Sequence, residues 1–298
     1  MITELNKRVR EELCPCGNWH LSDFVEKFLK HQVNRLPKRE VSDEEARYPK
    51  KPSDMRAFLD TFFARHYFQV QNSLIDYMTS EVFFDILNSQ ELNILDIGSG
   101  PAVAPLAITD LLAYILGNIR SIDATANVKN IKINYILNDT SSICLGTGFE
   151  FLRNYFRFNK YPQNKVLNAL TFRIEKSFPS NIEQLKRISR NLNFYHLIIF
   201  SYVINLLNEE EGFLSTINGI KQLETLCHPN GRLLILQDKF NESLTRRIAT
   251  ALGCSCKKNV LRQYTYSTIN SNDLYTYSYY QCLFPPYRNK CKFGIKPA

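Results

Sequence analysis

The chain has 298 residues, 44% of them hydrophobic, with a formal net charge of +8. This composition excludes a disordered protein and is sufficient for one large α/β core with an additional helical layer. The basic charge permits an acidic partner such as nucleic acid, but it is also ordinary for a soluble protein. No apolar run reaches the ~18 residues of a membrane span, and the sequence near Met1 lacks a signal-peptide core, so we expect a cytoplasmic protein without a membrane partner.

Residues 1–90 are predicted to form an N-terminal helical region. Residues 21–33 place apolar side chains at helical spacing, whereas residues 34–54 are charged, contain three prolines and indicate a surface connection. A longer helix is expected from about Ser53 to Met78, because its apolar residues form one continuous stripe. Most of the aromatic residues in that stripe are expected in the core.

Residues 91–298 are predicted to form a second region in which strands alternate with helices. Five segments have the composition of buried strands: 93–97, 131–137, 169–174, 195–204 and 231–237. The last of them follows a predicted turn, HPNG, and two β-favouring runs within 260–284 indicate an antiparallel hairpin. The fold class is therefore α/β, with a doubly wound, mostly parallel seven-stranded sheet, an antiparallel edge hairpin and an N-terminal helical layer.

The stretch LNILDIGSGPAVAPLAI, residues 92–108, is a strand, a glycine turn and a helix. Such a turn lets a ligand approach the backbone at the carboxyl end of the strand, where the following helix offers free amide donors. A dinucleotide site would need G-x-G-x-x-G, and here the third glycine is missing while Pro101 removes one donor. A P-loop is excluded because no G-K-[ST] follows the turn.

The segment LDIGSGPA, residues 95–102, resembles the first motif of the class I S-adenosylmethionine-dependent methyltransferases. That motif is a strand ending in an acidic residue followed by G-x-G-x-G, and Ala102 stands where a third glycine is common. The resemblance covers roughly residues 93–237 and implies a Rossmann-like fold with S-adenosylmethionine as cofactor. It implies that Asp96 and the backbone of Gly98 to Gly100 hold the methionine part, and that Asp139 binds the ribose hydroxyls.

Further contacts are predicted at the ends of the later strands. Cofactor contacts are expected at Ser99, Thr140, Glu175 and Ser201, and substrate contacts at Tyr67, Tyr202 and Asn205. Structural alternatives exist for several of these residues. Asp96 and Asp139 can cap the segments that follow them, and Glu175 can be a solvated carboxylate. Ser201 and Tyr202 can be buried hydroxyls bonded to the backbone, and Tyr67 can be a core residue. Asp139 is farther from Asp96 than the ~20 residues of the compact dinucleotide pattern, which indicates a longer helix and loop before the second strand.

The sequence does not identify the substrate or a catalytic residue. The fourth strand ends in FSYVIN, residues 200–205, without the (D/N)-P-P-(Y/F) signature of enzymes that methylate exocyclic amines of bases. The segments ARHYFQVQNSLIDYM (64–78), CLGTGFEFL (144–152) and SYVINLL (201–207) show a faint resemblance to methyltransferase-like proteins of mitochondrial small-ribosomal-subunit assembly. The net charge and the basic residues and tyrosines within 246–292 favour RNA or a ribonucleoprotein as the substrate, although cross-strand pairs in a hairpin explain the tyrosines better.

Three hypotheses follow. The first is a methyltransferase acting on RNA or a ribonucleoprotein, the second is a small-molecule N- or O-methyltransferase, and the third is a non-catalytic binding or assembly factor with this fold.

No metal is predicted, since the two C-x-C pairs do not have the usual zinc spacing. Six cysteines remain candidate ligands: Cys14, Cys16, Cys254, Cys256, Cys282 and Cys291.

Overall fold

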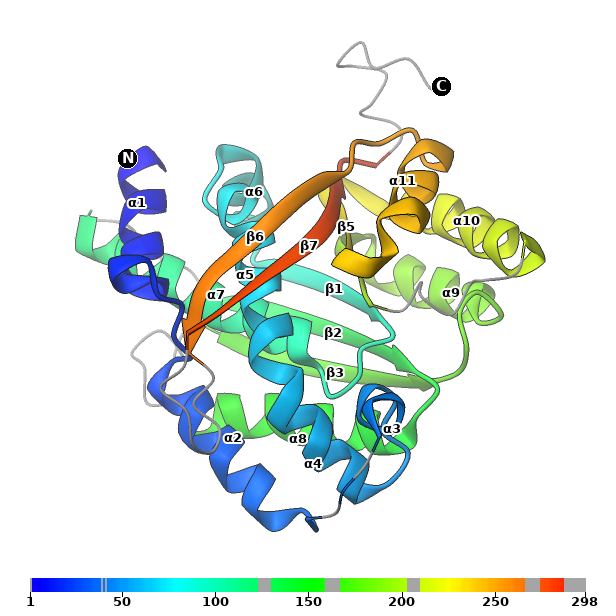
Figure 1. Ribbon diagram of the computed structural model, residues 1–298. Helices are drawn as coiled ribbons and strands as arrows, with labels where there is room; N and C mark the ends of the chain where they lie inside the picture. Colours follow the sequence, from blue (N-terminus) through cyan, green and yellow to red (C-terminus); the bar gives the residue numbers. More distant parts are fainter. Residues whose placement is uncertain are drawn as a thin grey trace.

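A seven-stranded sheet crosses the centre of the molecule (Figure 1). The computed structural model describes residues 2–38, 40, 42–122, 130–158, 167–202, 210–265 and 274–286. The strand order is β3-β2-β1-β4-β5-β7-β6. The strands are β1 (Glu91–Ile97), β2 (Ile131–Asp139), β3 (Leu167–Glu175), β4 (Tyr195–Ser201), β5 (Cys227–Asp238), β6 (Lys257–Thr265) and β7 (Leu274–Phe284).

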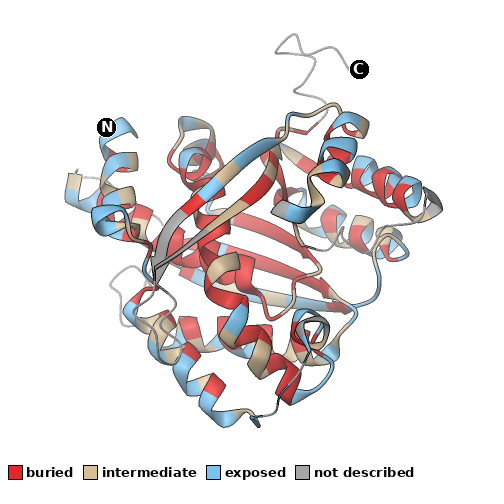
Figure 2. Ribbon diagram, viewed as in Figure 1, coloured by how far each residue is buried: buried red, intermediate tan, exposed pale blue. Residues whose placement is uncertain are grey.

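The first five strands are parallel, and β7 joins β5 in antiparallel register with β6 outside it. The predicted fold class, including the edge hairpin, is therefore confirmed. Six of the seven residues of β1 are buried, as expected for a central strand covered on both faces (Figure 2). The order reverses between β1 and β4, and ligands of doubly wound sheets bind beside such a switch point at the strands' carboxyl ends.

Helices cover both faces of the sheet. They are α1 (Ile2–Leu13), α2 (Asp23–Arg35), α3 (Asp43–Arg47), α4 (Pro52–Thr61), α5 (Phe63–Met78), α6 (Glu81–Leu87), α7 (Val103–Ile122), α8 (Ser142–Phe158), α9 (Ile182–Leu192), α10 (Glu210–Glu224) and α11 (Glu242–Ala251). One hydrophobic core joins one face of the sheet to the N-terminal helices, α7 and α8, and a second core joins the other face to α9, α10 and α11. The predicted boundary near residue 90 thus runs through a shared core.

α7 is the central helix of the larger core. By length and composition it could span a membrane, yet 78% of its most apolar window is buried inside the fold, as expected of a core helix. It extends to Ile122, beyond the apolar run seen in the sequence. Its one acidic residue, Asp110, accepts hydrogen bonds from the hydroxyls of Tyr67 and Tyr155 at 2.5 and 2.8 Å.

Three local predictions are wrong. The helix expected from Ser53 to Met78 is two helices, α4 and α5, which meet at Phe62. The HPNG segment is not a turn, because residues 228–231 belong to β5 where its register against β4 shifts, and Gly231 there lies against the carbonyl of His196. The segment 34–54 is more than a surface connection, since it contains α3 and supplies residues to the cavity described below.

Candidate functional site

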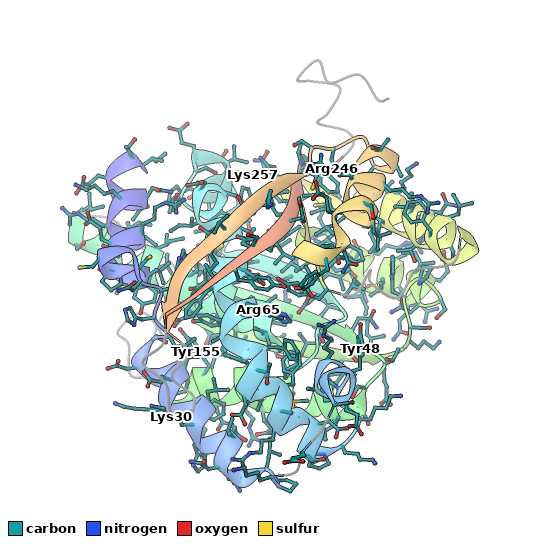
Figure 3. All side chains as sticks on the ribbon, viewed as in Figure 1. Lys30, Tyr48, Arg65, Tyr155, Arg246 and Lys257 are labelled. Atoms are coloured by element: carbon teal, nitrogen blue, oxygen red, sulfur yellow. The ribbon has the colours of Figure 1, made fainter. Side chains whose placement is uncertain are left out.

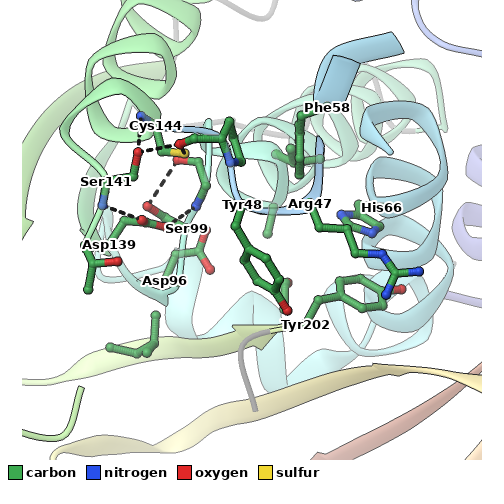
Figure 4. A pocket seen from close by; sticks show the side chains of 18 of the residues that line it. Arg47, Tyr48, Phe58, His66, Asp96, Ser99, Asp139, Ser141, Cys144 and Tyr202 are labelled. Atoms are coloured by element: carbon green, nitrogen blue, oxygen red, sulfur yellow. Dashed lines mark hydrogen bonds between the residues drawn. The ribbon is translucent and has the colours of Figure 1, made fainter. Parts of the chain in front are cut away.

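A cavity of about 250 Å³ lies at the carboxyl ends of β1, β2 and β4. One wall is made by the glycine turn after β1 and the end of β2, and the opposite wall by α3, α4, α5 and the residue after β4. In Figure 4, Asp96, Ser99 and Asp139 stand on one side, and Arg47, His66 and Tyr202 on the other. The two walls differ in charge as well as in origin.

The glycine turn has a left-handed backbone at three positions. Gly98, Gly100 and Ala102 have φ angles of 65°, 50° and 57°. The side chain of Asp139 fixes the turn, because its Oδ2 accepts a hydrogen bond from the Gly100 amide at 2.9 Å. A Cβ at Gly100 would meet only Phe58, at 4.0 Å, so the turn faces open space in the cavity. This is the close backbone approach that the sequence predicts.

Ala102 occupies the third left-handed position, where glycine would be unstrained. The room for its side chain comes from Gly148 on α8: a Cβ at Gly148 would lie 2.7 Å from Ala102 Cβ and 2.8 Å from its amide nitrogen. Gly148 is far from the turn in sequence but adjacent to it in the fold, and its missing side chain leaves the space that Ala102 occupies in place of the third glycine.

Substituting Gly148→Ala is expected to lower the free energy of unfolding by about 1–3 kcal/mol, since the new methyl group clashes with the backbone of the turn. Gly146→Ala on the same helix is the control: a Cβ there meets nothing within 4 Å, so this variant should match or exceed the wild type. Adding Ala102→Gly to Gly148→Ala should restore part of the loss. Urea unfolding of the four proteins measures this, and equal stability of the two alanine variants would contradict it.

Asp96 borders the cavity as an unpaired buried carboxylate. Its side chain is 1% exposed, and neither oxygen has a hydrogen-bond partner among the described residues. Burial raises the pKa of Asp96 well above its usual value, and the negative charge of Asp139 raises it further. A positively charged group in the cavity would relieve both effects.

Asp139 closes β2 beside the same wall. Its two oxygens accept hydrogen bonds from the amides of Gly100 and Ser141 at 2.9 and 2.8 Å. Burial raises the pKa of Asp139, and these amide donors partly offset that effect. Each carboxylate oxygen has a second lone pair, so Asp139 can hold the turn and still accept hydrogen bonds from ligand hydroxyls.

The opposite wall is built around Tyr202, directly after β4. Its φ of 61° turns the side chain back over α5, where the ring stacks on His66 with centroids 3.9 Å apart. Its hydroxyl donates to the side-chain oxygen of Gln69. Burial lowers the pKa of His66 well below its usual value, and the charges of Arg65 and Arg47 add to this effect. His66 is therefore a neutral imidazole at neutral pH.

The structure brings most predicted cofactor residues together at the cavity: Asp96, Gly98, Ser99, Gly100, Asp139, Thr140 and Ser201. Of the predicted substrate residues, Tyr202 lines the cavity, and Asn205 lies outside the described residues. Tyr67 is not brought to the cavity: it is fully buried, and its hydroxyl is bound to Asp110. Glu175 is exposed at the end of β3, and the loop reaches the cavity at Lys176 and Ser177 instead.

Sequence reasoning missed the helical wall. Arg65 and His66 follow Phe62 by three and four residues, so one face of the helix reaches the cavity. The sequence does contain a signal for this wall: the polar residues Arg65 and His66 lie at the edge of the apolar stripe predicted between Ser53 and Met78. Arg47 and Tyr48 also line the cavity, but they lie in the charged segment that indicated only a connection.

The tyrosines of the hairpin that the structure describes do not form a stacking surface for bases. Tyr279 and Tyr280 are buried, and their hydroxyls contact Asn72 and Glu242, respectively. Tyr277 lies under the guanidinium of Arg65. These side chains follow the alternative of a packed hairpin, and an RNA partner stays a prediction.

Of the candidate metal ligands, Cys254 and Cys256 pack against the core that contains Cys282. In the described parts of the chain no group of three or more histidine, cysteine, aspartate or glutamate residues is arranged to hold a metal ion. Cys291 lies outside those parts.

Comparison with known proteins gives structural neighbours only. No protein-family model and no curated protein matches the chain. The solved structures that resemble it include a precorrin-6Y C5,15-methyltransferase from Geobacter metallireducens GS-15, with a TM-score of 0.37, 9% identity, and coverage of 67% of this chain and 85% of that one. The N-methyltransferase NodS from Bradyrhizobium japonicum WM9 has a TM-score of 0.37, 13% identity, and coverage of 76% and 98%.

An O-methyltransferase family protein from Burkholderia thailandensis has a TM-score of 0.39, 13% identity, and coverage of 88% of this chain and 68% of that one. Likeness at these identities and TM-scores says nothing of the activity or substrate of this chain.

Proposed function

We propose that the protein is an S-adenosylmethionine-dependent methyltransferase. The observation that carries this proposal is the unpaired, buried carboxylate of Asp96 beside the glycine turn. A phosphate-bearing nucleotide fits this wall poorly, because it would face both Asp96 and Asp139. S-adenosylmethionine instead offers an ammonium and a sulfonium charge to the carboxylates and ribose hydroxyls to Asp139.

The residues present fit this cofactor in three respects. The left-handed turn at Gly98 and Gly100 leaves the backbone accessible, Asp139 has free lone pairs, and Asp96 lacks the cation that its burial requires. When bound, the cofactor supplies an activated methyl group on sulfur.

The chain would orient the acceptor behind that methyl group and exclude water. His66 is the residue of the opposite wall that can accept a hydrogen bond from an acceptor hydroxyl or amine. Its imidazole is neutral, borders the cavity and is held in place by the ring of Tyr202. A small-molecule acceptor is favoured over RNA because His66 lies inside a cavity and the described hairpin tyrosines are packed.

Calorimetry with two ligands tests the cofactor. S-adenosylmethionine carries the amino-acid part, whereas 5′-methylthioadenosine keeps only the nucleoside and the sulfur. Asp96→Asn should weaken S-adenosylmethionine by at least about tenfold and leave 5′-methylthioadenosine within about twofold, because only the first ligand brings a cation to Asp96. Asp139→Asn should weaken both ligands.

A second measurement is the number of protons released when S-adenosylmethionine binds. A cation beside Asp96 lowers its raised pKa, so binding should release a proton, and affinity should rise with pH. Titration in two buffers of different ionisation enthalpy measures that proton, which the Asp96→Asn variant should not release. Absence of S-adenosylmethionine binding to the folded wild type would contradict the proposed function and favour an assembly factor.

A further inference from the structure

We propose that the acceptor is an anionic small molecule, whose carboxylate or phosphate group is bound by Arg65 and Arg47. This inference rests on the proposed function and names the substrate class of the same site. It is carried by the opposite charge of the two cavity walls and by the environment of the two arginines.

Arg65 supplies the inner half of the proposed anion site. It lies on α5 near the middle of the molecule, whereas Arg246 and Lys257 stand at the periphery (Figure 3). Its guanidinium stacks over the rings of Tyr277 and Phe62, at 4.3 and 5.0 Å from their centroids. The Nε atom of Arg65 is buried and has no hydrogen-bond partner among the described residues.

Burying a guanidinium nitrogen without a hydrogen-bond acceptor costs free energy of folding. The two aromatic rings interact with the faces of the guanidinium, but they do not accept hydrogen bonds from its N–H donors. The donors of a guanidinium form a planar fork that matches a carboxylate or a phosphate. An anion in the cavity would therefore complete the coordination that the protein leaves open.

Arg47 supplies the outer half. It is exposed at the cavity mouth, on the last residue of α3, and its guanidinium lies 5.9 Å from the centroid of the Phe62 ring that Arg65 also contacts. Among the ion pairs of the described residues, none joins Arg47 or Arg65 to a carboxylate. Two positive charges thus converge on one aromatic ring beside the cavity.

The remaining charged groups of this wall do not cancel the arginines. Asp238 lines the cavity and offsets one of the positive charges, and its carboxylate accepts a hydrogen bond from the hydroxyl of Tyr277. His66 contributes no charge, because the nearby arginines oppose its protonation. Lys50 at the mouth adds positive charge. On the other wall Asp96 and Asp139 outnumber Lys176 of the loop after β3, so the two walls favour ligand groups of opposite charge.

RNA would also present phosphate groups to the two arginines. The test therefore compares small probes with a single-stranded RNA oligonucleotide. The probes are 4-hydroxybenzoate and phenyl phosphate, which are anions with different groups, and 4-hydroxybenzamide, which has the size of the first probe without its charge.

Binding is measured by calorimetry on the full chain saturated with S-adenosylhomocysteine, so that no methyl transfer occurs. At least one anionic probe should bind at least tenfold more tightly than 4-hydroxybenzamide, and the preferred probe distinguishes a carboxylate from a phosphate acceptor. Arg65→Met should abolish this preference, and Arg47→Met should reduce it. Arg153→Met, on the exposed face of α8 and paired with Glu150, is the matched control and should change nothing.

The cofactor arm separates the two proposals. S-adenosylhomocysteine affinity should stay within about twofold in both cavity variants, and failure of the wild type to bind it would contradict the proposed function rather than the anion site. Four results, each obtained with S-adenosylhomocysteine bound, would overturn the anion site. The charged and neutral probes bind with equal affinity, or neither anion binds at millimolar concentration. Alternatively, Arg65→Met keeps the preference for the anion, or RNA binds tightly while neither small anion does.

Discussion

Replacing Asp110 by alanine should lower the free energy of unfolding by about 3–5 kcal/mol. Asp110 is 1% exposed on α7 and accepts hydrogen bonds from Tyr67 on α5 and Tyr155 on α8. Both hydroxyls are buried, and burial raises the pKa of each tyrosine well above its usual value, so they remain neutral donors. Without Asp110 each donor would lose its acceptor at a cost of about 1–3 kcal/mol, and a small cavity would add to the loss.

Four further variants isolate the hydrogen bonds from the packing. Asp110→Asn keeps one oxygen acceptor and should cost less than Asp110→Ala. Tyr67→Phe and Tyr155→Phe each remove one donor, and adding both to Asp110→Leu should recover much of the stability, because all partners then become apolar. Urea unfolding followed by circular dichroism measures the series. A midpoint for Asp110→Ala equal to that of the wild type would show that the network contributes nothing.

The same network explains why the role predicted for Tyr67 was misplaced. His66 and Tyr67 are neighbours in sequence, and adjacent residues of an α-helix point about 100° apart. Periodicity identified the apolar stripe of α5 but could not show which edge of it faces the cavity. The polar edge with Arg65 and His66 faces the ligand space, whereas Tyr67 faces α7.

The sheet could be predicted because each strand is a local signal. The five parallel strands and the hairpin are continuous runs of β-favouring residues, and the motif at residues 95–102 lies where the strand order reverses. Tertiary packing determines the features that the sequence pattern does not predict. Proline and glycine in HPNG are turn signals, yet the segment lies within β5 because its strand irregularity is absorbed as a register shift against β4.

The second wall of the cavity could not be read from the sequence, since its residues come from separate elements. Arg47 and Arg65 meet at Phe62 only after α3 packs against α4, the helix that ends just before Phe62. The missing third glycine is a further case. Ala102 is tolerated because Gly148, far along the chain, leaves room for it.

The contribution of His196 to the stability of the protein should fall by about 3 kcal/mol as the pH drops from 6.5 toward 4. His196 lies on β4 and is 7% exposed, and its Nδ1 accepts a hydrogen bond from the Asn93 amide at 2.9 Å. Burial and the neighbouring His228 lower the pKa of His196 to about 4 from 6.5, and Glu91 opposes this shift. The Nδ1 acceptor is lost when that nitrogen is protonated.

The sign follows from which state binds the proton. Between pH 6.5 and about 4 the unfolded chain is protonated at His196 and the folded chain is not, so acid favours unfolding. Above pH 6.5 neither state is protonated at this residue, and the full stability is present. The loss should be about 2 kcal/mol at pH 5, and it should reach its limit below pH 4.

His196→Asn tests the assignment, because its side-chain oxygen can replace Nδ1 as the acceptor for the Asn93 amide without titrating. Urea unfolding between pH 4.5 and 8 should show a variant that is less stable than the wild type at pH 8, owing to its smaller side chain, but whose stability falls less steeply toward acid. The difference between the two curves removes the contributions of Asp96, Asp110 and Asp139. Burial raises the pKa of all three carboxyl groups, so they act in the opposite direction.

The variant His228→Asn separates the two causes of the lowered pKa of His196, which are burial and the neighbouring His228. The His228 ring lies 5.1 Å from that of His196, and its loss should raise the pKa of His196 without restoring the ordinary value, since burial remains. The acid loss should therefore become smaller in His228→Asn and smallest in His196→Asn. If the wild-type and His196→Asn curves ran parallel over the whole range, His196 would be protonated alike in the folded and unfolded chains, and the acid sensitivity would have to come from another group.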